Sequence, residues 1–173
     1  EVLSAVYEPL VTLDRSMRPV PTLAVSWETP DPLTWVFRLR PGVRFHDGSP
    51  LTAEDAAASL RRLITEARLE MRSYLSGVAE VSTRGEDAVV VRTLRPNAQL
   101  ASRLHFALVV PKGSTSDSLV RRANGTGPFA VAGWRPGQPF PDATLAIASG
   151  ATFACVVVGQ ATNAFACRSE RRP

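Results

Sequence analysis

The stretch Val43-Arg44-Phe45-His46-Asp47-Gly48-Ser49-Pro50-Leu51-Thr52-Ala53-Glu54-Asp55 places a strong turn signal directly before a helix start. Asp47-Gly48 is typical of a tight turn. Thr52 can accept the main-chain N–H three residues on, and acidic side chains favour the positive end of a helix, so the segment resembles a capping box. The stretch therefore predicts a short extended piece over residues 43–45, a loop, and a helix that begins at Ala53.

The residues that follow continue this helix. Apolar side chains recur at helical spacing and form one stripe, whereas most charged side chains fall off it. This is the most clearly patterned helix of the chain. The stripe consists of Ala56, Leu60, Leu63 and Ile64, and the charged residues off it are Glu54, Arg61, Arg62 and Glu66.

Two pairs of β-branched and aromatic runs predict antiparallel hairpins. Turn residues separate the runs of each pair: Pro30-Asp31-Pro32 in the first and Arg84-Gly85-Glu86-Asp87 in the second. Because hairpins and helices alternate without regular βαβ spacing, the sequence indicates a mixed α/β fold. The predicted strands are residues 26–28 with 34–39, and residues 78–83 with 88–94.

Shorter elements are predicted on either side of these hairpins. They are the end of a helix over residues 2–10 stopped near Pro9, a strand over 10–13 that turns at Asp14, a helix over 97–104 capped by Asn97, a buried strand over 107–110, a helix over 118–123 closed by Asn124-Gly125, and a strand over 129–134.

The composition is that of a globular domain, with 173 residues, 45% hydrophobic and 21% charged. The net charge is +4 and the pI about 9.8, but Lys112 is the only lysine and the arginines are scattered, so a nucleic-acid surface is not expected. The most apolar stretch, residues 151–167, is interrupted by polar side chains and falls short of a membrane-spanning helix. The first residue is Glu1, so we expect any export signal to be already absent.

Five motifs follow one another along the chain. They are Val6-Tyr7-Glu8-Pro9-Leu10-Val11, Leu23-Ala24-Val25-Ser26-Trp27-Glu28, Thr34-Trp35-Val36-Phe37-Arg38-Leu39-Arg40, the stretch from Val43 to Asp55, and Gly125-Thr126-Gly127-Pro128-Phe129. In this order they resemble the family 5 solute-binding proteins, the dipeptide, oligopeptide and nickel receptors of ABC importers. The resemblance extends from Glu1 to about Gln138, and a different character begins at Pro139.

The resemblance implies a bilobal protein of the periplasmic-binding-protein-like type II fold, which closes like a hinge over its ligand. It implies that residues 1–34 and 107–150 belong to a discontinuous first lobe and that residues 35–106 form a small inserted domain. Residues 151–173 are an atypical tail. The second lobe is expected to be absent from this chain.

The resemblance also implies a function. The protein would capture a peptide or similar small solute in a cleft and deliver it to a membrane permease of an ABC importer, as a monomer without cofactor or catalysis. Its location would be periplasmic or otherwise extracytoplasmic, with lipid anchoring left open. A truncated or frameshifted fragment that binds no ligand is a competing hypothesis.

Six residues are the expected ligand contacts: Tyr7, Glu8, His105, Phe106, Gly125 and Thr126. The resemblance places the first four beside the cleft. A structural role is the alternative for these four: Tyr7 and Glu8 could pack in a helix, and His105 and Phe106 could pack at the edge of a strand. The three tryptophans, Trp27, Trp35 and Trp134, are expected in the core rather than stacked on a ligand, because each lies in or beside a predicted strand.

The sequence gives little support for a hydrolytic site, a dinucleotide-binding loop or a metal site. His46, Asp47 and Ser49 could form a hydrolytic set, but side chains at adjacent turn positions rarely converge. Gly125 to Ala130 has the glycine spacing of a dinucleotide loop, yet a strand rather than a helix is predicted to follow it. No metal site is expected, because the His and Cys residues form no close pairs: they are His46, His105, Cys155 and Cys167.

Overall fold

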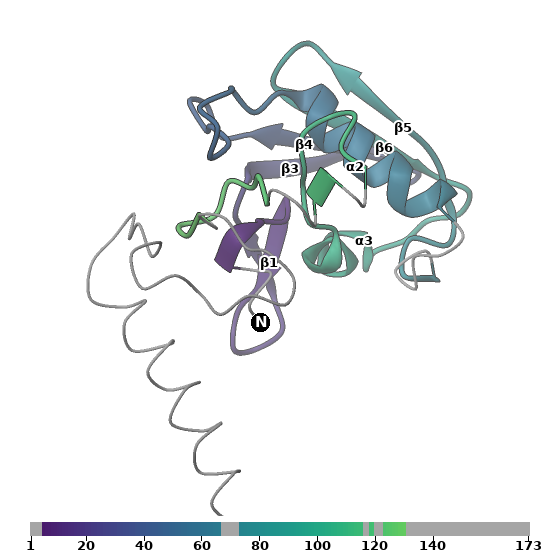
Figure 1. Cartoon of the computed structure of the whole chain (residues 1–173). Coiled ribbons are helices and arrows are strands. Elements are labelled where there is room, and N and C mark those ends of the chain that lie inside the picture. The colour runs from purple at the N-terminus through teal and green to yellow at the C-terminus, as the bar shows by residue number, and fades with distance from the viewer. Residues whose placement is uncertain (1–4, 67–72, 116–117, 120–122, 131–173) are drawn as a thin grey trace, which may run out of the picture.

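The computed structural model describes residues 5–66, 73–115, 118–119 and 123–130. A four-stranded antiparallel sheet with the order β3-β4-β6-β5 is the main layer, and helix α2 lies across one of its faces (Figure 1). A two-stranded sheet of β1 and β2 and the short helix α3 lie beside it. The bounds are β1 Val11–Leu13, β2 Pro19–Pro21, β3 Ala24–Asp31, β4 Thr34–Leu39, α2 Ala53–Thr65, β5 Val78–Arg84, β6 Ala88–Thr93, α3 Leu100–Arg103 and a 3₁₀ turn Leu104–Phe106.

Both predicted hairpins are confirmed, and the structure joins them through β4 and β6. Phe37 stands opposite Trp27 on β3 and opposite Val89 on β6. Side chains directly opposite one another point to the same face of a sheet. One row of large apolar side chains therefore crosses the sheet under α2.

The first hairpin turns two residues later than the sequence suggests. Strand β3 continues through Pro30 to Asp31, which pairs with Thr34, so the turn consists of residues 32–33. The Asp31 carboxylate accepts the N–H of Leu33 at 2.9 Å. This hydrogen bond, with a further one from the Thr34 hydroxyl, holds the pKa of Asp31 below its ordinary value.

Helix α2 starts as predicted. The Thr52 hydroxyl accepts the Asp55 N–H at 3.3 Å, and the Asp55 carboxylate accepts the Thr52 N–H at 2.9 Å, which completes the capping box. The helix packs against β5 and β6 (Figure 1). Its predicted apolar stripe is confirmed: Ala56 and Leu60 are fully buried, and Leu63 and Ile64 pack at the edge of the core.

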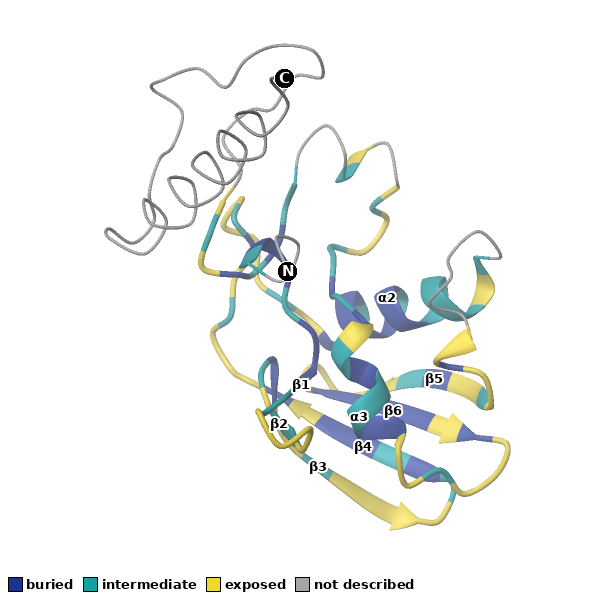
Figure 2. Cartoon of the chain, turned by 90° about the horizontal axis from the view of Figure 1, so that it is seen from below, coloured by how far each residue is buried: buried dark blue, intermediate teal, exposed yellow. Residues whose placement is uncertain are grey.

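The core lies between α2 and the sheet, and Figure 2 shows β4, β6 and the inner side of α2 as mostly buried. Trp27 and Trp35 pack against it, with ring centroids 6.3 and 6.0 Å from that of Phe37. Both were expected in the core, and both contact it. The far half of β3 is exposed.

The same core also takes residues from the amino-terminal segment and from the segment after the 3₁₀ turn, including Leu10, Val11, Ala107 and Val109. One continuous cluster thus draws on both expected ranges, 1–34 with 107–150 and 35–106. The division into a lobe and an inserted domain stays a prediction.

Two of the shorter elements differ from expectation. The predicted helix over 97–104 begins only at Leu100, because the Asn97 side chain accepts the Gln99 N–H at 3.1 Å and holds a turn before the helix. The predicted strand over 107–110 is a single bridge between Leu108 and Pro9. Proline has no N–H to donate, so the pairing cannot extend as a regular ladder.

The terminal predictions fall partly outside the described residues. Ala5 and Val6 are helical and the helix ends before Tyr7, in agreement with a stop near Pro9, while β1 begins at Val11. Of the helix predicted over 118–123, only Ser118 and Leu119 are described as helical. Most of the strand predicted over 129–134, Trp134, and the tail over 151–173 lie outside the described residues. In the part that is described, no helix has the length and apolar character needed to cross a membrane.

Candidate ligand-binding site

An open groove of about 620 Å³ lies beside α3. Its volume is within the range of sites for small molecules. Three segments far apart in the sequence form its wall: the β1–β2 hairpin, the segment before β5, and the stretch from α3 through the 3₁₀ turn. They contribute Leu13 and Met17, then Ser73, Tyr74 and Ser76, and finally Gln99, Ser102, Arg103, His105 and Phe106.

Three rings form a cluster in this groove. The centroids of Tyr74 and Phe106 lie 4.7 Å apart, and those of His105 and Phe106 lie 3.5 Å apart. Tyr74 and Phe106 are nevertheless 44% and 40% exposed, whereas most of the large apolar side chains that the structure describes are buried or half-buried. Exposed aromatic rings that gather in a concave site are typical of ligand contacts.

Arg103 gives the groove its charge. It is the only charged side chain among the described residues that line it. One guanidinium nitrogen lies 3.4 Å from the side-chain oxygen of Gln99, which orients the group. A guanidinium presents several N–H donors in a plane and pairs well with a carboxylate, so the groove favours an anionic group on its ligand.

Met17 stands at the rim in an unusual conformation. It is the only non-glycine residue of the described part with positive φ, at 60°, and it is 70% exposed. The Asp14 carboxylate holds the turn by accepting the N–H groups of Ser16 and Arg18 at 2.8 and 2.9 Å. A left-handed methionine costs about 1–2 kcal/mol. Such strain is often found at binding sites, and here it presents a flexible apolar side chain to the groove.

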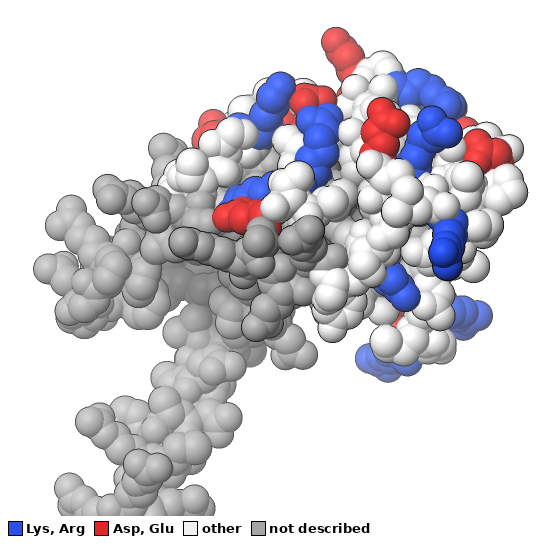
Figure 3. All heavy atoms as spheres, turned by 90° about the vertical axis from the view of Figure 1, so that its right-hand side faces the viewer, with Lys and Arg blue, Asp and Glu red and all other residues white. Residues whose placement is uncertain are grey.

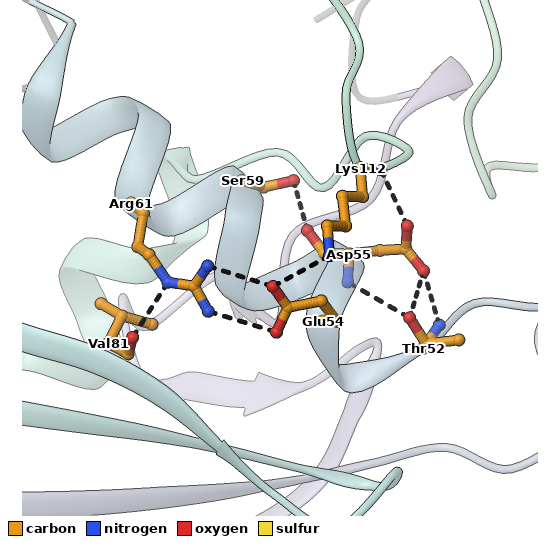
Figure 4. A network of polar contacts seen from close by, with 7 residues as sticks. All are labelled: Thr52, Glu54, Asp55, Ser59, Arg61, Val81 and Lys112. Atoms are coloured by element: carbon orange, nitrogen blue, oxygen red, sulfur yellow. Dashed lines mark hydrogen bonds and ion pairs between the residues drawn. The ribbon is translucent and has the colours of Figure 1, made fainter.

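A polar network fastens the chain that leaves the groove (Figure 4). The Asp55 carboxylate, already bound to Thr52, also accepts the Lys112 N–H at 2.8 Å. The Ser59 hydroxyl accepts the Val110 N–H at 3.0 Å and lies within hydrogen-bond distance of the Asp55 carbonyl oxygen. The first turns of α2 therefore hold the segment that directly follows His105 and Phe106.

We expect Asp55→Ala to destabilise the chain by about 1–2 kcal/mol, because it removes a helix cap and takes the carboxylate acceptor from the partly buried N–H groups of Thr52 and Lys112. Chemical denaturation followed by circular dichroism measures the change. Glu66→Ala, at the other end of the same helix, is the control and should change stability by less than about 0.5 kcal/mol, as expected of a partly exposed ion pair with Arg62. Equal losses in the two variants would contradict the role given to Asp55.

Glu54 completes the network on the exposed side of α2. The pKa of Glu54 lies below its ordinary value, mainly because Arg61 donates hydrogen bonds to its carboxylate. Lys112, which forms an ion pair with the same carboxylate, lowers the pKa further. Because the folded-state pKa is lowered, the stabilisation is present above the ordinary glutamate pKa and is lost as the pH falls through the lowered value. Arg61 also donates to the Val81 carbonyl at 3.0 Å, so this side chain ties α2 to β5.

A second cluster joins residues 46–47 to residues 124–127. The His46 N–H donates to the Gly125 carbonyl at 2.9 Å, and its ring nitrogens bond the main chain at Gly125 and Gly127. The Asn124 side chain donates to the Asp47 carboxylate at 2.7 Å. The two loops are therefore locked to each other.

The amino-terminal segment packs against the same cluster. The N–H of Gly127 donates to the Val6 carbonyl at 2.9 Å. A Cβ atom on Gly125 would lie 1.9 Å from the Val6 carbonyl oxygen, and one on Gly127 would lie 2.5 Å from that of Ala5. Burial raises the pKa of Tyr7, and a main-chain hydrogen bond with Asn124 opposes part of this shift. These glycines permit close contact between main chains.

The expected ligand residues fall into these two places. His105 and Phe106 line the groove, whereas Tyr7, Gly125 and Thr126 belong to the second cluster, and none of these three lines the groove. Glu8 contributes its carbonyl oxygen, which accepts the Val109 N–H at 3.0 Å. The assignment of all six residues as ligand contacts stays a prediction, and the groove favours His105 and Phe106.

The hydrolytic alternative does not fit the geometry. The Ser49 hydroxyl donates to the Asp47 carboxylate at 2.6 Å, while both ring nitrogens of His46 are used by main-chain groups of Gly125 and Gly127. The imidazole is therefore not placed to take a proton from Ser49. Among the described residues, no group of three or more His, Cys, Asp or Glu side chains could hold a metal ion.

Sequence reasoning missed the groove residues other than His105 and Phe106. Tyr74 and Arg103 had no motif around them, and Met17 lies in a turn without glycine. Their common wall depends on the packing of β1 against α3 and the 3₁₀ turn, which no local pattern predicts. The one available signal was an aromatic at 74 beside serines, in a segment with no clear periodicity.

The charged side chains on the visible face of the molecule are of both signs (Figure 3). On the face that Figure 3 shows, acidic and basic side chains are interspersed over its upper part. Elsewhere in the described part of the chain, charged side chains also pair, as Arg61 does with Glu54 and Arg38 with Asp87. The net charge of +4 therefore does not gather into one basic patch on the part of the face that is described.

The fold is that of the periplasmic-binding-protein type II class, in its family 5 form. Two solved structures from A. tumefaciens R10 match 79% of this chain: the binding protein AgaA in complex with agropinic acid, with a TM-score of 0.67 and 29% identity, and MoaA in complex with mannopinic acid, with a TM-score of 0.72 and 27% identity. The chain covers 29% and 30% of these two proteins.

The family model for bacterial extracellular solute-binding proteins, family 5, middle part, matches residues 18–141, and the chain belongs to this family. The nickel-binding periplasmic protein of Escherichia coli K12 is 32% identical over 137 residues, which is 74% of this chain. The chain spans only about a quarter of that relative, 26% of its length. The family is described as bacterial extracellular solute-binding proteins, a class that binds solutes and is not enzymatic. Relatives of similar identity also include HTH-type transcriptional regulators named SgrR, such as that of Pectobacterium atrosepticum at 32%.

Proposed function

We propose that this chain supplies one wall of the solute site in an extracytoplasmic receptor of an ABC importer, and that the groove beside α3 is that wall. The aromatic cluster with Arg103 in an open concavity is the observation that carries the proposal. A permease in the membrane would receive the solute. No chemical step is performed on it.

The proposed solute is a peptide or peptide-like molecule with a carboxylate. Arg103 would pair with the carboxylate, and Tyr74 and Phe106 would contact an apolar part. The acids bound by AgaA and MoaA agree with this class, since these two proteins are similar to the chain over most of its described length. In the complete receptor, a second lobe would close over the open side of the groove.

Calorimetric titration with alanyl-phenylalanine and with its C-terminal amide tests the proposal. The dipeptide should bind more tightly than the amide, because only the dipeptide offers a carboxylate to Arg103. Arg103→Gln should weaken dipeptide binding at least about tenfold and remove the difference between the two ligands. Arg84→Gln, an exposed arginine on β5, is the control and should bind like the unmodified chain.

Absence of binding by the unmodified chain, verified as folded by circular dichroism, would contradict the proposed function. If the chain binds both ligands equally well and Arg103→Gln does not weaken binding, the chain would still be a solute-binding protein, but this groove would be excluded as its binding site.

A further inference from the structure

The ring of His105 is held in one orientation. Its Nδ1 atom lies 2.7 Å from the carbonyl oxygen of Ser102, and its ring contacts that of Phe106. A carbonyl oxygen can only accept a hydrogen bond, so Nδ1 must carry a proton. In the neutral imidazole, the other nitrogen, Nε2, then keeps a free electron pair and acts as an acceptor.

His46, the other histidine of the chain, differs in this respect. Its Nε2 atom lies 2.8 Å from the Gly127 carbonyl oxygen and must donate, while its Nδ1 accepts the Gly125 N–H at 3.3 Å. Both nitrogens of His46 are therefore used by the main chain. In the described part of the chain, no hydrogen bond engages Nε2 of His105, and His105 lines the groove.

The polar side chains from α3 and the 3₁₀ turn that line the groove differ in what they can donate or accept. Arg103, two residues before His105, offers only donors. The nearby hydroxyl of Ser102 and amide of Gln99 can each donate or accept, so neither demands one kind of partner. The imidazole is the one side chain here, among the described groove residues, whose orientation fixes it as an acceptor.

From these observations we propose that Nε2 of His105 selects solutes with an N–H donor close to the carboxylate that Arg103 binds. The inference rests on the proposed function and adds a specificity-determining residue to it: among solutes with a carboxylate, His105 favours those in which an ammonium or amide N–H lies close to that carboxylate. His105 accepts from this N–H, and Arg103 donates to the carboxylate. A carboxylic acid without such a donor leaves the imidazole acceptor without a partner, which costs affinity.

The tautomer can be measured without any ligand. Long-range ¹H–¹⁵N correlation spectra of the imidazole groups, recorded at pH 8 where histidine is ordinarily neutral, distinguish a protonated Nδ1 from a protonated Nε2. We expect Nδ1–H for His105 and Nε2–H for His46, which serves as the internal control. An Nε2–H tautomer for His105 would overturn the inference.

Ligand discrimination is the second measurement. Alanyl-phenylalanine is compared with propionyl-phenylalanine, which lacks the ammonium, and with the ester analogue in which oxygen replaces the amide N–H. At least one analogue should bind the unmodified chain about tenfold more weakly than the dipeptide. His105→Phe keeps a ring but no acceptor, so this penalty should disappear in that variant, whereas Arg84→Gln should retain it.

The outcomes separate the two proposals. If the dipeptide binds and its analogues show the same affinity ratios in His105→Phe as in the unmodified chain, His105 does not select the donor, and the inference is wrong while the proposed function stands. If no probe binds the folded unmodified chain, the proposed function fails and the inference fails with it.

Discussion

Gly125→Ala is expected to destabilise the chain by about 3 kcal/mol or more, because Gly125 is buried against the main chain of Val6. The new Cβ would lie 1.9 Å from the carbonyl oxygen and 2.7 Å from the carbonyl carbon of Val6. Both are main-chain atoms and cannot rotate away. The segment that carries Tyr7 would have to separate from the loop that contains Gly127, with loss of the hydrogen bonds between them.

Chemical denaturation followed by tryptophan fluorescence measures this effect. Gly113→Ala is the matched control: its φ is +79°, but no atom lies within 4 Å of the added Cβ. That variant should lose only the about 1–2 kcal/mol that a left-handed alanine costs. If Gly125→Ala were no worse than Gly113→Ala, close main-chain contact would not be the reason for glycine at position 125.

Phe37→Ala is the second substitution with a large expected effect, about 3–5 kcal/mol. Phe37 is fully buried at the centre of the sheet, where its ring contacts those of Trp27 and Trp35. Removing it leaves a cavity between the sheet and α2. The midpoint of denaturation should fall accordingly, and the near-ultraviolet circular dichroism of the two tryptophans should weaken.

Val25→Ala on the neighbouring strand is the control for this experiment. Val25 is 43% exposed, so its substitution should change stability by less than about 0.5 kcal/mol. If both variants lost a similar amount of stability, burial of Phe37 in the core under α2 would not be the reason for its effect. Any shortened side chain in the sheet would then be destabilising.

Much of the local structure could be predicted from the sequence because its signals are local. The capping box at Thr52 and Asp55 acts within one helical turn, and the glycine turn at Gly85 acts within one hairpin. The alternation along β4 predicted a strand with one buried face, but Val36 and Phe37 are both fully buried on opposite faces, so the local pattern gave the strand and not its burial. The errors occurred where a contact from elsewhere competes with the local pattern, as at Pro9, which limits its pairing with Leu108 to one bridge.

The candidate site was only partly within reach of the sequence. Family resemblance indicated His105 and Phe106, which line the groove, but also Tyr7 and Gly125, which lie in a different cluster. Tyr74 and Arg103 were missed because neither stands in a motif. Their partners across the groove come from other segments of the chain.

By itself, the sequence determined the mixed α/β class, the hairpins, the capped helix α2 and the solute-binding family, because propensity, periodicity and motif order are properties of neighbouring residues. Only the tertiary structure decided that β4 joins β6, that Asp55 holds Lys112, and that Tyr74 meets Phe106. These contacts join residues 32 to 58 positions apart in the chain. They form because the apolar faces of several segments are buried against one another at the same time, and no single segment specifies them.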